Sequence, residues 1–294
     1  DAIDPHTANG AGEIVSLSNA EGLLELKLGP SFRQHPRALV PQGPRDDREK
    51  RTAVRRVARS VAEHGIEGAG PHRALRDLVA GAPPRIEGLA PGASLVQRGE
   101  KGVEAVARLA PLLRESTLAV QGPPGTGKTY AGAQAIVELV RQGRRVGISA
   151  HSHRAIVNLI EQTLDAAAAR GVTVRVGQRA DGDDRTDREE VLDLSNDEIA
   201  RGLTAGTVDV VAGTPWLFAR QQLLGKLDVL VIDEAGQMAL ADVIAAGGAA
   251  SSRLLLGDPN QLRQPTRARH PDGAGRSVLE HVLGGEVTIP AARG

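Results

Sequence analysis

Short apolar runs alternate with amphipathic stretches from about residue 117 onward. The runs predict strands at 117–121, 145–150, 172–177, 208–212, 228–232 and 252–256. Several of these runs are almost wholly apolar, as the strands of a parallel sheet are when helices cover both of its faces. Stretches with helical spacing separate several of the runs. This part of the chain therefore predicts an α/β fold with a doubly wound parallel sheet.

The first part of the chain follows another pattern. Residues 14–17 and 23–28 flank the polar segment 19–22 and predict a β-hairpin. Apolar residues at 54, 57, 58 and 61 have helical spacing and predict an amphipathic helix over about 46–63. Further helices are predicted near 72–80 and 101–114, and a linker rich in Gly, Pro and Ala at 81–93. We therefore expect a smaller α+β accessory region over 1–93 and the α/β domain over 94–294.

Composition narrows the function classes. The 294 residues have a formal net charge of zero, so any nucleic-acid binding must come from a local surface. Cysteine is absent, which excludes disulfides and thiolate metal sites. No apolar run approaches membrane-spanning length, and no signal peptide is visible. We expect a cytoplasmic protein without a membrane partner. Because the chain begins at Asp1 and its one Met is Met238, we also expect a piece of a longer protein.

The strongest chemical signal is Gly122-Pro-Pro-Gly-Thr-Gly-Lys-Thr129, directly after a predicted strand. It fits the phosphate-binding loop pattern G-x-x-x-x-G-K-[ST]. Its glycines let backbone N–H groups surround a triphosphate, and the helix predicted from Lys128 to Arg141 adds its positive N-terminal end. Lys128 can reach the β- and γ-phosphates, and the Thr129 hydroxyl can bind Mg²⁺. The predicted nucleotide-binding residues of this loop are Gly122, Pro123, Pro124, Gly125, Thr126, Gly127, Lys128 and Thr129.

Two carboxylates follow the apolar run at 228–232. At the carboxyl end of a parallel strand, Asp233 and Glu234 would lie beside the phosphate loop. We predict that Asp233 holds Mg²⁺ and that Glu234 acts as general base for the attacking water. A third motif, Leu254-Leu-Leu-Gly-Asp-Pro-Asn-Gln261, ends another strand. Gln261 can reach the γ-phosphate, although the same residues also suit a capped turn.

Two charged stretches have simpler interpretations. The arginines of the predicted helix over 46–63 are interpreted as a solvated helix surface, with a nucleic-acid contact as the alternative. The acidic run 181–190 is interpreted as an exposed loop, with a metal site as the alternative.

The three motifs, in this order, resemble motifs I, II and III of superfamily 1 helicases, in the branch of the nonsense-decay and Okazaki-processing helicases. The segment 146–160 resembles motif Ia, and Val210-Val-Ala-Gly-Thr-Pro215 resembles motif Ic. The resemblance covers about residues 117–285. It implies a first RecA-like domain of a P-loop NTPase, with ATP and Mg²⁺ as cofactors. More narrowly, the chain resembles bacterial proteins in which a RecB-like nuclease domain precedes such a helicase.

The resemblance also implies a strand-binding surface and a partner domain. By position, Ser152, His153, Thr214 and Pro215 would line the path of single-stranded DNA or RNA. Gln237 and Gln261 would contact the nucleotide. Trp216 and Phe218 are interpreted as packing residues of a helix, with base stacking as the alternative. Motifs IV to VI, which belong to a second RecA-like domain, would lie beyond Gly294.

The sequence departs from the family pattern at two other places. No Leu-Asn-x-x-Gln pattern stands at the expected distance before the phosphate loop, and Gln97 lies too far upstream to take its role. Gln261-Leu-Arg-Gln-Pro265 replaces the common Gln-Leu-Pro-Pro, so Arg263 and Gln264 have no assigned role.

The sequence therefore predicts the ATP-hydrolysing motor domain of a DNA or RNA helicase, with Lys128, Asp233, Glu234 and Gln261 as catalytic residues. The family implies 5′-to-3′ translocation. The alternatives are a P-loop kinase, another P-loop ATPase, or an ATP-binding module without unwinding activity. On its own this piece is expected to be nearly inactive.

Overall fold

The computed structural model describes residues 2–3, 10–18, 22–28, 40–41, 46–261 and 275–289. The chain divides into two compact units, Asp1–Asp47 and Arg48–Gly294. The smaller unit is an antiparallel sheet in the order β3-β2-β1-β4. Its strands are β1 (Ala2–Ile3), β2 (Gly10–Ser18), β3 (Leu23–Lys27) and β4 (Val40–Pro41). The predicted hairpin is confirmed, with Leu17 opposite Leu24 in register; residues 19–21 of its loop lie outside the described residues.

The larger unit contains the predicted parallel sheet. Its seven strands have the order β5-β11-β10-β6-β9-β7-β8, and every pair of neighbours is parallel. They are β5 (Thr117–Gln121), β6 (Val146–Ala150), β7 (Val176–Gln178), β8 (Val191–Asp193), β9 (Val210–Ala212), β10 (Leu227–Asp233) and β11 (Ala250–Gly257). Six of the strands were predicted. The seventh, β8, was missed because it is a short edge strand whose Leu192 is exposed, so no apolar run marks it.

Helices connect and cover these strands. They are α1 (Arg48–His64), α2 (Arg73–Ala80), α3 (Gly102–Leu109), α4 (Lys128–Arg141), α5 (His153–Ala169), α6 (Asn196–Ala205), α7 (Pro215–Phe218), α8 (Leu240–Gly247) and α9 (Val278–Leu283). Short 3₁₀ turns are η1 (Ala110–Leu112), η2 (Gly182–Asp184), η3 (Gln221–Leu223) and η4 (Ala235–Gln237). The helix predicted over 101–114 changes to η1 after Leu109, since Pro111 cannot continue an α-helix without a clash and a lost hydrogen bond.

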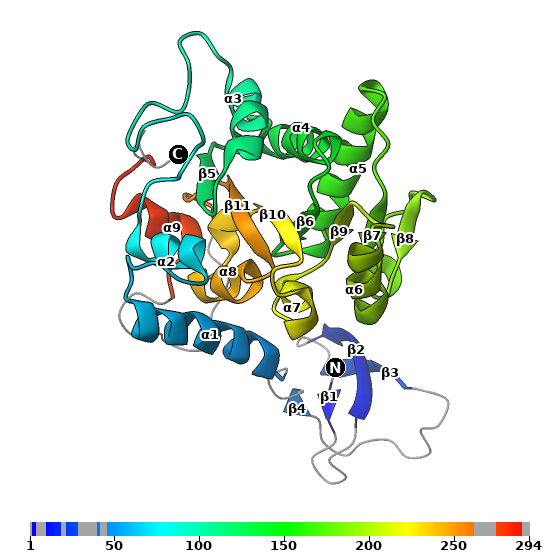
Figure 1. The fold of residues 1–294 in the computed structure, drawn as a ribbon. Helices are drawn as coiled ribbons and strands as arrows, with labels where there is room; N and C mark the ends of the chain where they lie inside the picture. Colours follow the sequence, from blue (N-terminus) through cyan, green and yellow to red (C-terminus); the bar gives the residue numbers. More distant parts are fainter. Residues whose placement is uncertain are drawn as a thin grey trace. The chain divides into compact units, whose positions relative to one another are not determined.

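Alternate side chains of the central strands enter two different core layers. On β10, Val229 and Val231 pack in one layer with residues of α3, α4 and α5. Leu230 and Ile232 pack in the other layer with residues of α2, α6, α7, α8 and α9. Figure 1 shows α4 and α5 on one side of the strands and α7 and α8 on the other. Each fully buried side chain of this size contributes about 1.5–3 kcal/mol. The doubly wound fold is thus confirmed.

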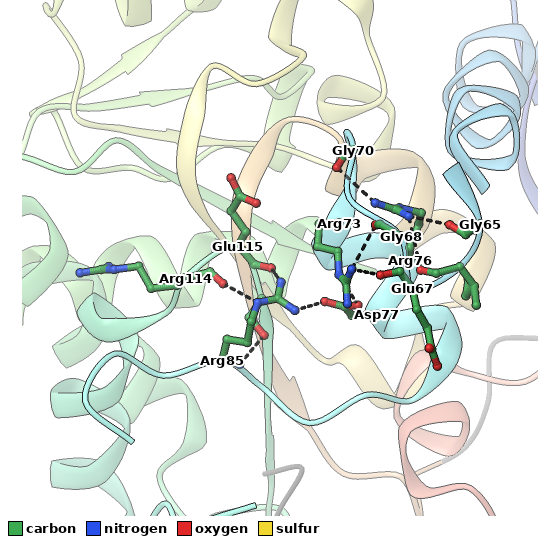
Figure 2. Close-up of polar contacts among 12 residues, drawn as sticks. Gly65, Glu67, Gly68, Gly70, Arg73, Arg76, Asp77, Arg85, Arg114 and Glu115 are labelled. Atoms are coloured by element: carbon green, nitrogen blue, oxygen red, sulfur yellow. Dashed lines mark hydrogen bonds and ion pairs between the residues drawn. The ribbon is translucent and has the colours of Figure 1, made fainter. Parts of the chain in front are cut away.

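Hydrogen bonds connect helix α2 to the residues just before β5, the strand that leads into the phosphate loop (Figure 2). The Asp77 carboxylate accepts a hydrogen bond of 2.8 Å from Arg73 and another from the Arg85 guanidinium. Arg85 also donates to the carbonyl oxygens of Arg114 and Glu115. Its backbone N–H donates to the Ser116 hydroxyl at 2.8 Å. Asp77 therefore joins α2 to the residues that precede β5.

Helix α1 packs against α8, and Lys50 is one of the residues that anchor it. The Lys50 ammonium lies 2.8 Å from the Asp242 carboxylate and 4.0 Å from the centroid of the Trp216 ring. Helices α1 and α2 belong to the same compact unit as the sheet, as do residues 81–93. The domain division after residue 93 stays a prediction.

Among the described residues, no helix is both long enough and apolar enough to span a membrane.

Candidate functional site

The phosphate loop is a glycine turn between β5 and α4. Gly125 and Gly127 have φ values of 79° and 80°, in the left-handed region that favours glycine. The Thr126 hydroxyl donates to the Pro123 carbonyl at 2.8 Å, and Gly122 N–H donates to the Gly257 carbonyl at 3.1 Å. The first bond closes a turn inside the loop, and the second joins the start of the loop to the end of β11. Residues 123–126 are exposed, so the loop is open to a ligand.

Lys128 folds back over this loop. Its ammonium donates to the carbonyl oxygens of Gly122 at 2.5 Å and Pro123 at 2.7 Å. Burial lowers the pKa of Lys128, and the negative charges of Asp258 and Asp233 partly oppose that effect. The partly buried Lys128 ammonium therefore lies beside the N-terminus of α4. Both the positive charge and the helix end favour binding of an anion such as a phosphate.

Asp233 faces the loop from the end of β10. The Thr129 hydroxyl donates to Oδ2 of Asp233 at 2.9 Å, and the backbone N–H of Glu234 donates to Oδ1 at 2.8 Å. Burial raises the pKa of Asp233, while these two hydrogen bonds and the Lys128 charge act in the opposite direction. A hydroxyl and a carboxylate side by side supply the hard oxygen donors that Mg²⁺ prefers, so the residues present fit this ion.

Glu234 follows in an uncommon backbone conformation. Its φ is 52°, in the left-handed region, and its side chain accepts a hydrogen bond of 3.1 Å from the Ser152 hydroxyl. Ser152 is the N-cap of α5, in the turn that follows the neighbouring strand β6, so the structure brings a predicted nucleic-acid-binding residue to the predicted general base. The sequence patterns did not indicate this contact.

The third motif packs closely on the second. The amide of Gln237 in η4 donates to the Gln261 side-chain oxygen at 3.5 Å. A Cβ atom at Gly257 would lie 2.8 Å from the backbone nitrogen of Gly236, so the two turns approach through glycines. Asp258 is buried and accepts a hydrogen bond of 2.9 Å from Asn260 N–H. Residues 262–265, which include Arg263 and Gln264, lie outside the described residues.

The predicted strand-path residues lie at the carboxyl ends of two neighbouring strands. Ser152 caps α5 by accepting from Ala155 N–H at 3.2 Å. His153 begins α5, and its Nε2 lies 3.7 Å from the Asp184 carboxylate in η2. Thr214 precedes α7 and is half-buried, whereas Pro215 is buried. Strands β6 and β9 are parallel neighbours. The residues that follow β6 and those that follow β9 therefore lie side by side at the carboxyl edge of the sheet.

The two aromatic residues of α7 pack inward or against α1. Phe218 is 1% exposed and belongs to the core, which agrees with the packing interpretation. Trp216 is half-buried, with the Lys50 ammonium over its ring.

A cavity of about 440 Å³ opens beside the start of the phosphate loop. Its lining is mostly apolar and includes Leu95, Val96, Ala105, Gly122, Pro123 and Ile289. The Gln121 side chain also borders it, accepting from Ile289 N–H at 2.8 Å and donating to the Val287 carbonyl at 3.3 Å. Sequence reasoning did not assign Gln121 or Asp258 to the site; the Gly257-Asp258 pair at the end of β11 was the available signal for Asp258.

Comparisons with known proteins found relatives that are named as helicases. The DNA replication ATP-dependent helicase/nuclease JHS1 of Arabidopsis thaliana is 31% identical over 176 residues, which cover 55% of this chain and 12% of that protein. The chain therefore spans only a small part of this relative's length. Among solved structures, the helicase nonstructural protein 10 of an arterivirus, in complex with DNA, is 16% identical over 57% of this chain and 34% of its own, with a TM-score of 0.37. The UvsW helicase of bacteriophage T4 is 11% identical over 63% of this chain and 59% of its own, with a TM-score of 0.38.

The family comparison covers the site itself. Residues 103–269 match the family described as AAA domain, and this range holds the phosphate loop, Asp233, Glu234 and Gln261. The match extends over more than half of the 294 residues. The chain belongs to the AAA domain family of P-loop proteins.

Proposed function

We propose that this chain is the ATP-binding and ATP-hydrolysing motor domain of a superfamily 1 helicase, in the branch of the nonsense-decay and Okazaki-processing helicases. The observation that carries the proposal is the 2.9 Å hydrogen bond between Thr129 and Asp233 beside the Lys128 ammonium. It joins a phosphate loop to the carboxylate of a second strand, as Mg²⁺-dependent phosphoryl transfer requires.

Each residue has a distinct task in this proposal. Lys128 and the N-terminus of α4 offset the charge of the triphosphate. Thr129 and Asp233 would hold Mg²⁺, which supplies charge neutralisation at the phosphates when bound. Glu234 accepts the proton of the attacking water. The amides of Gln237 and Gln261 lie within 3.5 Å of each other and are positioned to respond to the γ-phosphate.

Single-stranded DNA or RNA is the proposed partner at Ser152, His153, Thr214 and Pro215. The supporting observation is that the first two residues follow β6 and the other two follow its neighbour β9, so one strand can contact both segments. Half-exposed hydroxyl and imidazole groups suit contacts with the phosphate backbone, which carry no sequence information. The relative JHS1 is named for DNA replication, which favours DNA as the first ligand to test.

Unwinding is assigned to a longer protein. Strand separation needs two domains whose relative position changes with bound nucleotide, because only differential binding between states drives a conformational change. We propose a second RecA-like domain and, given that JHS1 is named a helicase/nuclease, a fused nuclease as partners. The 294-residue chain should therefore bind ATP and single strands weakly, hydrolyse ATP slowly and separate no tailed duplex.

Isothermal titration calorimetry with Mg²⁺-ATP tests the central claim. Lys128→Ala should weaken binding by about 1.5–3 kcal/mol, the usual range for a hydrogen bond to a charged group. Lys226→Ala is the matched control, because Lys226 precedes β10 at the opposite end of that strand from Asp233. Equal affinity of the Lys128→Ala variant and the wild type would refute the nucleotide site. Titrations with single-stranded DNA and RNA at several salt concentrations test the strand proposal, since phosphate contacts make affinity fall with salt.

A further inference from the structure

The outer face of α1 carries four arginines. Arg48, Arg51, Arg55 and Arg59 recur every three or four residues and are all exposed. At 3.6 residues per turn, they fall within a sector of about 80° around the helix axis. The opposite face of α1 is buried and packs against α8 and α2 (Figure 1). We call these four residues the arginine stripe.

The sector of the arginine stripe contains no acidic residue of α1. Glu49 and Glu63 are the acidic residues of this helix, and both fall outside the sector. The acidic pair at 46–47 precedes the helix, at the amino end of the stripe. Within the described part of the chain, neither Arg55 nor Arg59 has an ion-pair partner. The carboxyl half of the stripe is therefore a positive surface without a neutralising carboxylate among those residues.

Many exposed arginines elsewhere in the larger unit are arranged differently. Arg141 and Arg170 both pair with Glu138, and Arg175 pairs with Asp209. The chain has 36 acidic side chains for 36 basic ones, so its composition could supply carboxylates for α1 as well. The arginine stripe thus departs from the mixed charge of the surrounding surface.

The arginine stripe opposes the stability of the helix that carries it. Like charges four residues apart repel on a helix surface, and this applies to Arg51 with Arg55 and to Arg55 with Arg59. Arg48 and Arg51 also lie at the amino end of α1, where the helix dipole disfavours positive charge. A face that only solvates a helix typically alternates the two signs. An anionic ligand would relieve both of these repulsions.

The amino end of the arginine stripe lies beside the proposed strand path. The Lys50 ammonium, in the first turn of α1, is 4.0 Å from the centroid of the Trp216 ring. Trp216 directly follows Pro215, one of the proposed strand contacts. A strand that passes Pro215 would therefore meet this end of α1 next. From Arg48 to Arg59 the stripe extends about 16 Å along the helix axis, which exceeds the spacing of neighbouring phosphates.

We propose that the arginine stripe binds the phosphate backbone of a single nucleic-acid strand and extends the strand path beyond Thr214 and Pro215. The inference rests on the proposed function for its ligand, but it does not depend on ATP hydrolysis. Guanidinium groups form paired hydrogen bonds with phosphate oxygens, and such contacts do not read the base sequence. The proposal favours the nucleic-acid alternative for the arginines of this helix over a merely solvated surface.

Fluorescence anisotropy of a labelled oligodeoxythymidylate, titrated with the 294-residue chain at several salt concentrations, tests the stripe. For a single strand, the logarithm of the binding constant falls with the logarithm of the salt concentration by about 0.7 per phosphate contact. The double variant Arg55→Gln/Arg59→Gln should therefore have a slope that is shallower by about 1.4. Its affinity at low salt should fall about tenfold. Its unfolding temperature should match that of the wild type, because both side chains are exposed.

Two further double variants separate the stripe from total charge. Arg141→Gln/Arg144→Gln removes the same charge at the amino edge of the sheet, where α4 ends and β6 begins. It should leave the affinity and the salt slope unchanged. Arg55→Lys/Arg59→Lys keeps both positive charges on α1 and should retain most of the salt slope, because lysine also binds phosphate.

The outcomes distinguish the arginine stripe from the strand path that it extends. If Arg55→Gln/Arg59→Gln keeps the wild-type affinity and salt slope, the stripe is refuted, and a loss of affinity in Thr214→Ala would show that the strand path stands without it. Equal losses in Arg141→Gln/Arg144→Gln would indicate a general effect of charge and would also refute the stripe.

Two results with the wild type would overturn the ligand itself. If the wild type binds no oligodeoxythymidylate even at low salt, the stripe and the proposed strand path are both refuted. If polyglutamate of equal charge competes as strongly as unlabelled oligodeoxythymidylate, the stripe binds acidic polymers in general and is no nucleic-acid contact. A shallower slope confined to Arg55→Gln/Arg59→Gln, with weak competition by polyglutamate, supports the inference.

Discussion

The backbone of Gly236 lies against the carbonyl oxygen of Asp258, so closely that a Cβ atom at position 236 would overlap this oxygen. Gly257, the residue before Asp258, also approaches this turn, and a Cβ atom added to it would lie 2.8 Å from the backbone nitrogen of Gly236. The turn after β10 and the end of β11 are therefore separated by a gap that admits only hydrogen atoms. This contact constrains the separation of Asp233 and Asp258, the two carboxylates whose negative charges raise the pKa of Lys128 against the effect of burial.

Gly236→Ala should destabilise the chain by about 1–3 kcal/mol, since the added methyl group meets backbone that cannot swing away. Chemical denaturation gives this free energy of unfolding. Gly102→Ala is the control, because a Cβ at the start of α3 meets nothing within 4 Å. The control should stay within about 0.5 kcal/mol of the wild type. Equal stability of the two variants would contradict the close approach of the second and third motifs.

Glu234→Gln should retain Mg²⁺-ATP binding and lose hydrolysis. The amide keeps an oxygen that can accept from Ser152, and the contact between Thr129 and Asp233 is untouched. An amide cannot accept the proton of water, so the rate should fall by about 10²–10⁴-fold. Calorimetry and phosphate release measure the two properties separately. A variant rate within a few-fold of the wild type would show that another group accepts the proton.

Asp233→Asn should stabilise the ligand-free chain at neutral pH and abolish the stabilisation that Mg²⁺-ATP provides. Burial raises the pKa of Asp233, so the folded chain binds this proton more tightly than the unfolded chain does. The stability cost of ionisation is therefore full above the raised pKa and disappears below the ordinary value of about 3.9. The difference in unfolding free energy between variant and wild type should shrink as pH falls through that window. If the difference in unfolding free energy grew as the pH fell, the pKa of Asp233 would be lowered in the folded chain and not raised.

Asp77→Ala should destabilise the chain by about 1.5–3 kcal/mol, the range for hydrogen bonds to a charged group, because Arg73 and Arg85 lose their buried carboxylate but are themselves partly exposed. The Asp77 side chain is 6% exposed. Glu87→Ala removes the exposed carboxylate that pairs with Arg114 and should cost no more than about 1 kcal/mol. Thermal and chemical denaturation of both variants measure the free energy of unfolding. Equal decreases in the two variants would contradict the proposed structural role of Asp77.

The sequence predicts the parts of the fold that depend on local patterns. The apolar runs at β5, β6, β10 and β11 mark buried parallel strands, and the glycine loop marks the junction of β5 with α4. Strand β8 carries no such run, because it lies at the edge of the sheet with exposed side chains. The order of strands depends on crossover connections between distant segments, which no local pattern encodes.

In the candidate site, too, local motifs are predictable and contacts between distant segments are not. The motifs predict which residues bind the nucleotide, and a measurement of ATP binding tests that prediction. The motifs do not predict that Ser152 contacts Glu234, because the two residues are 82 positions apart and meet only through the pairing of β6 with β10. Asp258 was likewise missed, because its proximity to Lys128 depends on the β5–β11 pairing.

The scarcity of aromatic residues gives the chain two built-in optical reporters. Its single tryptophan, Trp216, follows Thr214 and Pro215 and carries the Lys50 ammonium over its ring. Its single tyrosine, Tyr130, follows Thr129 in α4 and is 51% exposed. The indole emission of the unmodified chain therefore comes from α7, directly after the proposed nucleic-acid contacts Thr214 and Pro215, and the phenol emission comes from the first turn of α4, beside the phosphate loop. Tryptophan and tyrosine fluorescence can therefore report on the two proposed ligands separately, without any added dye.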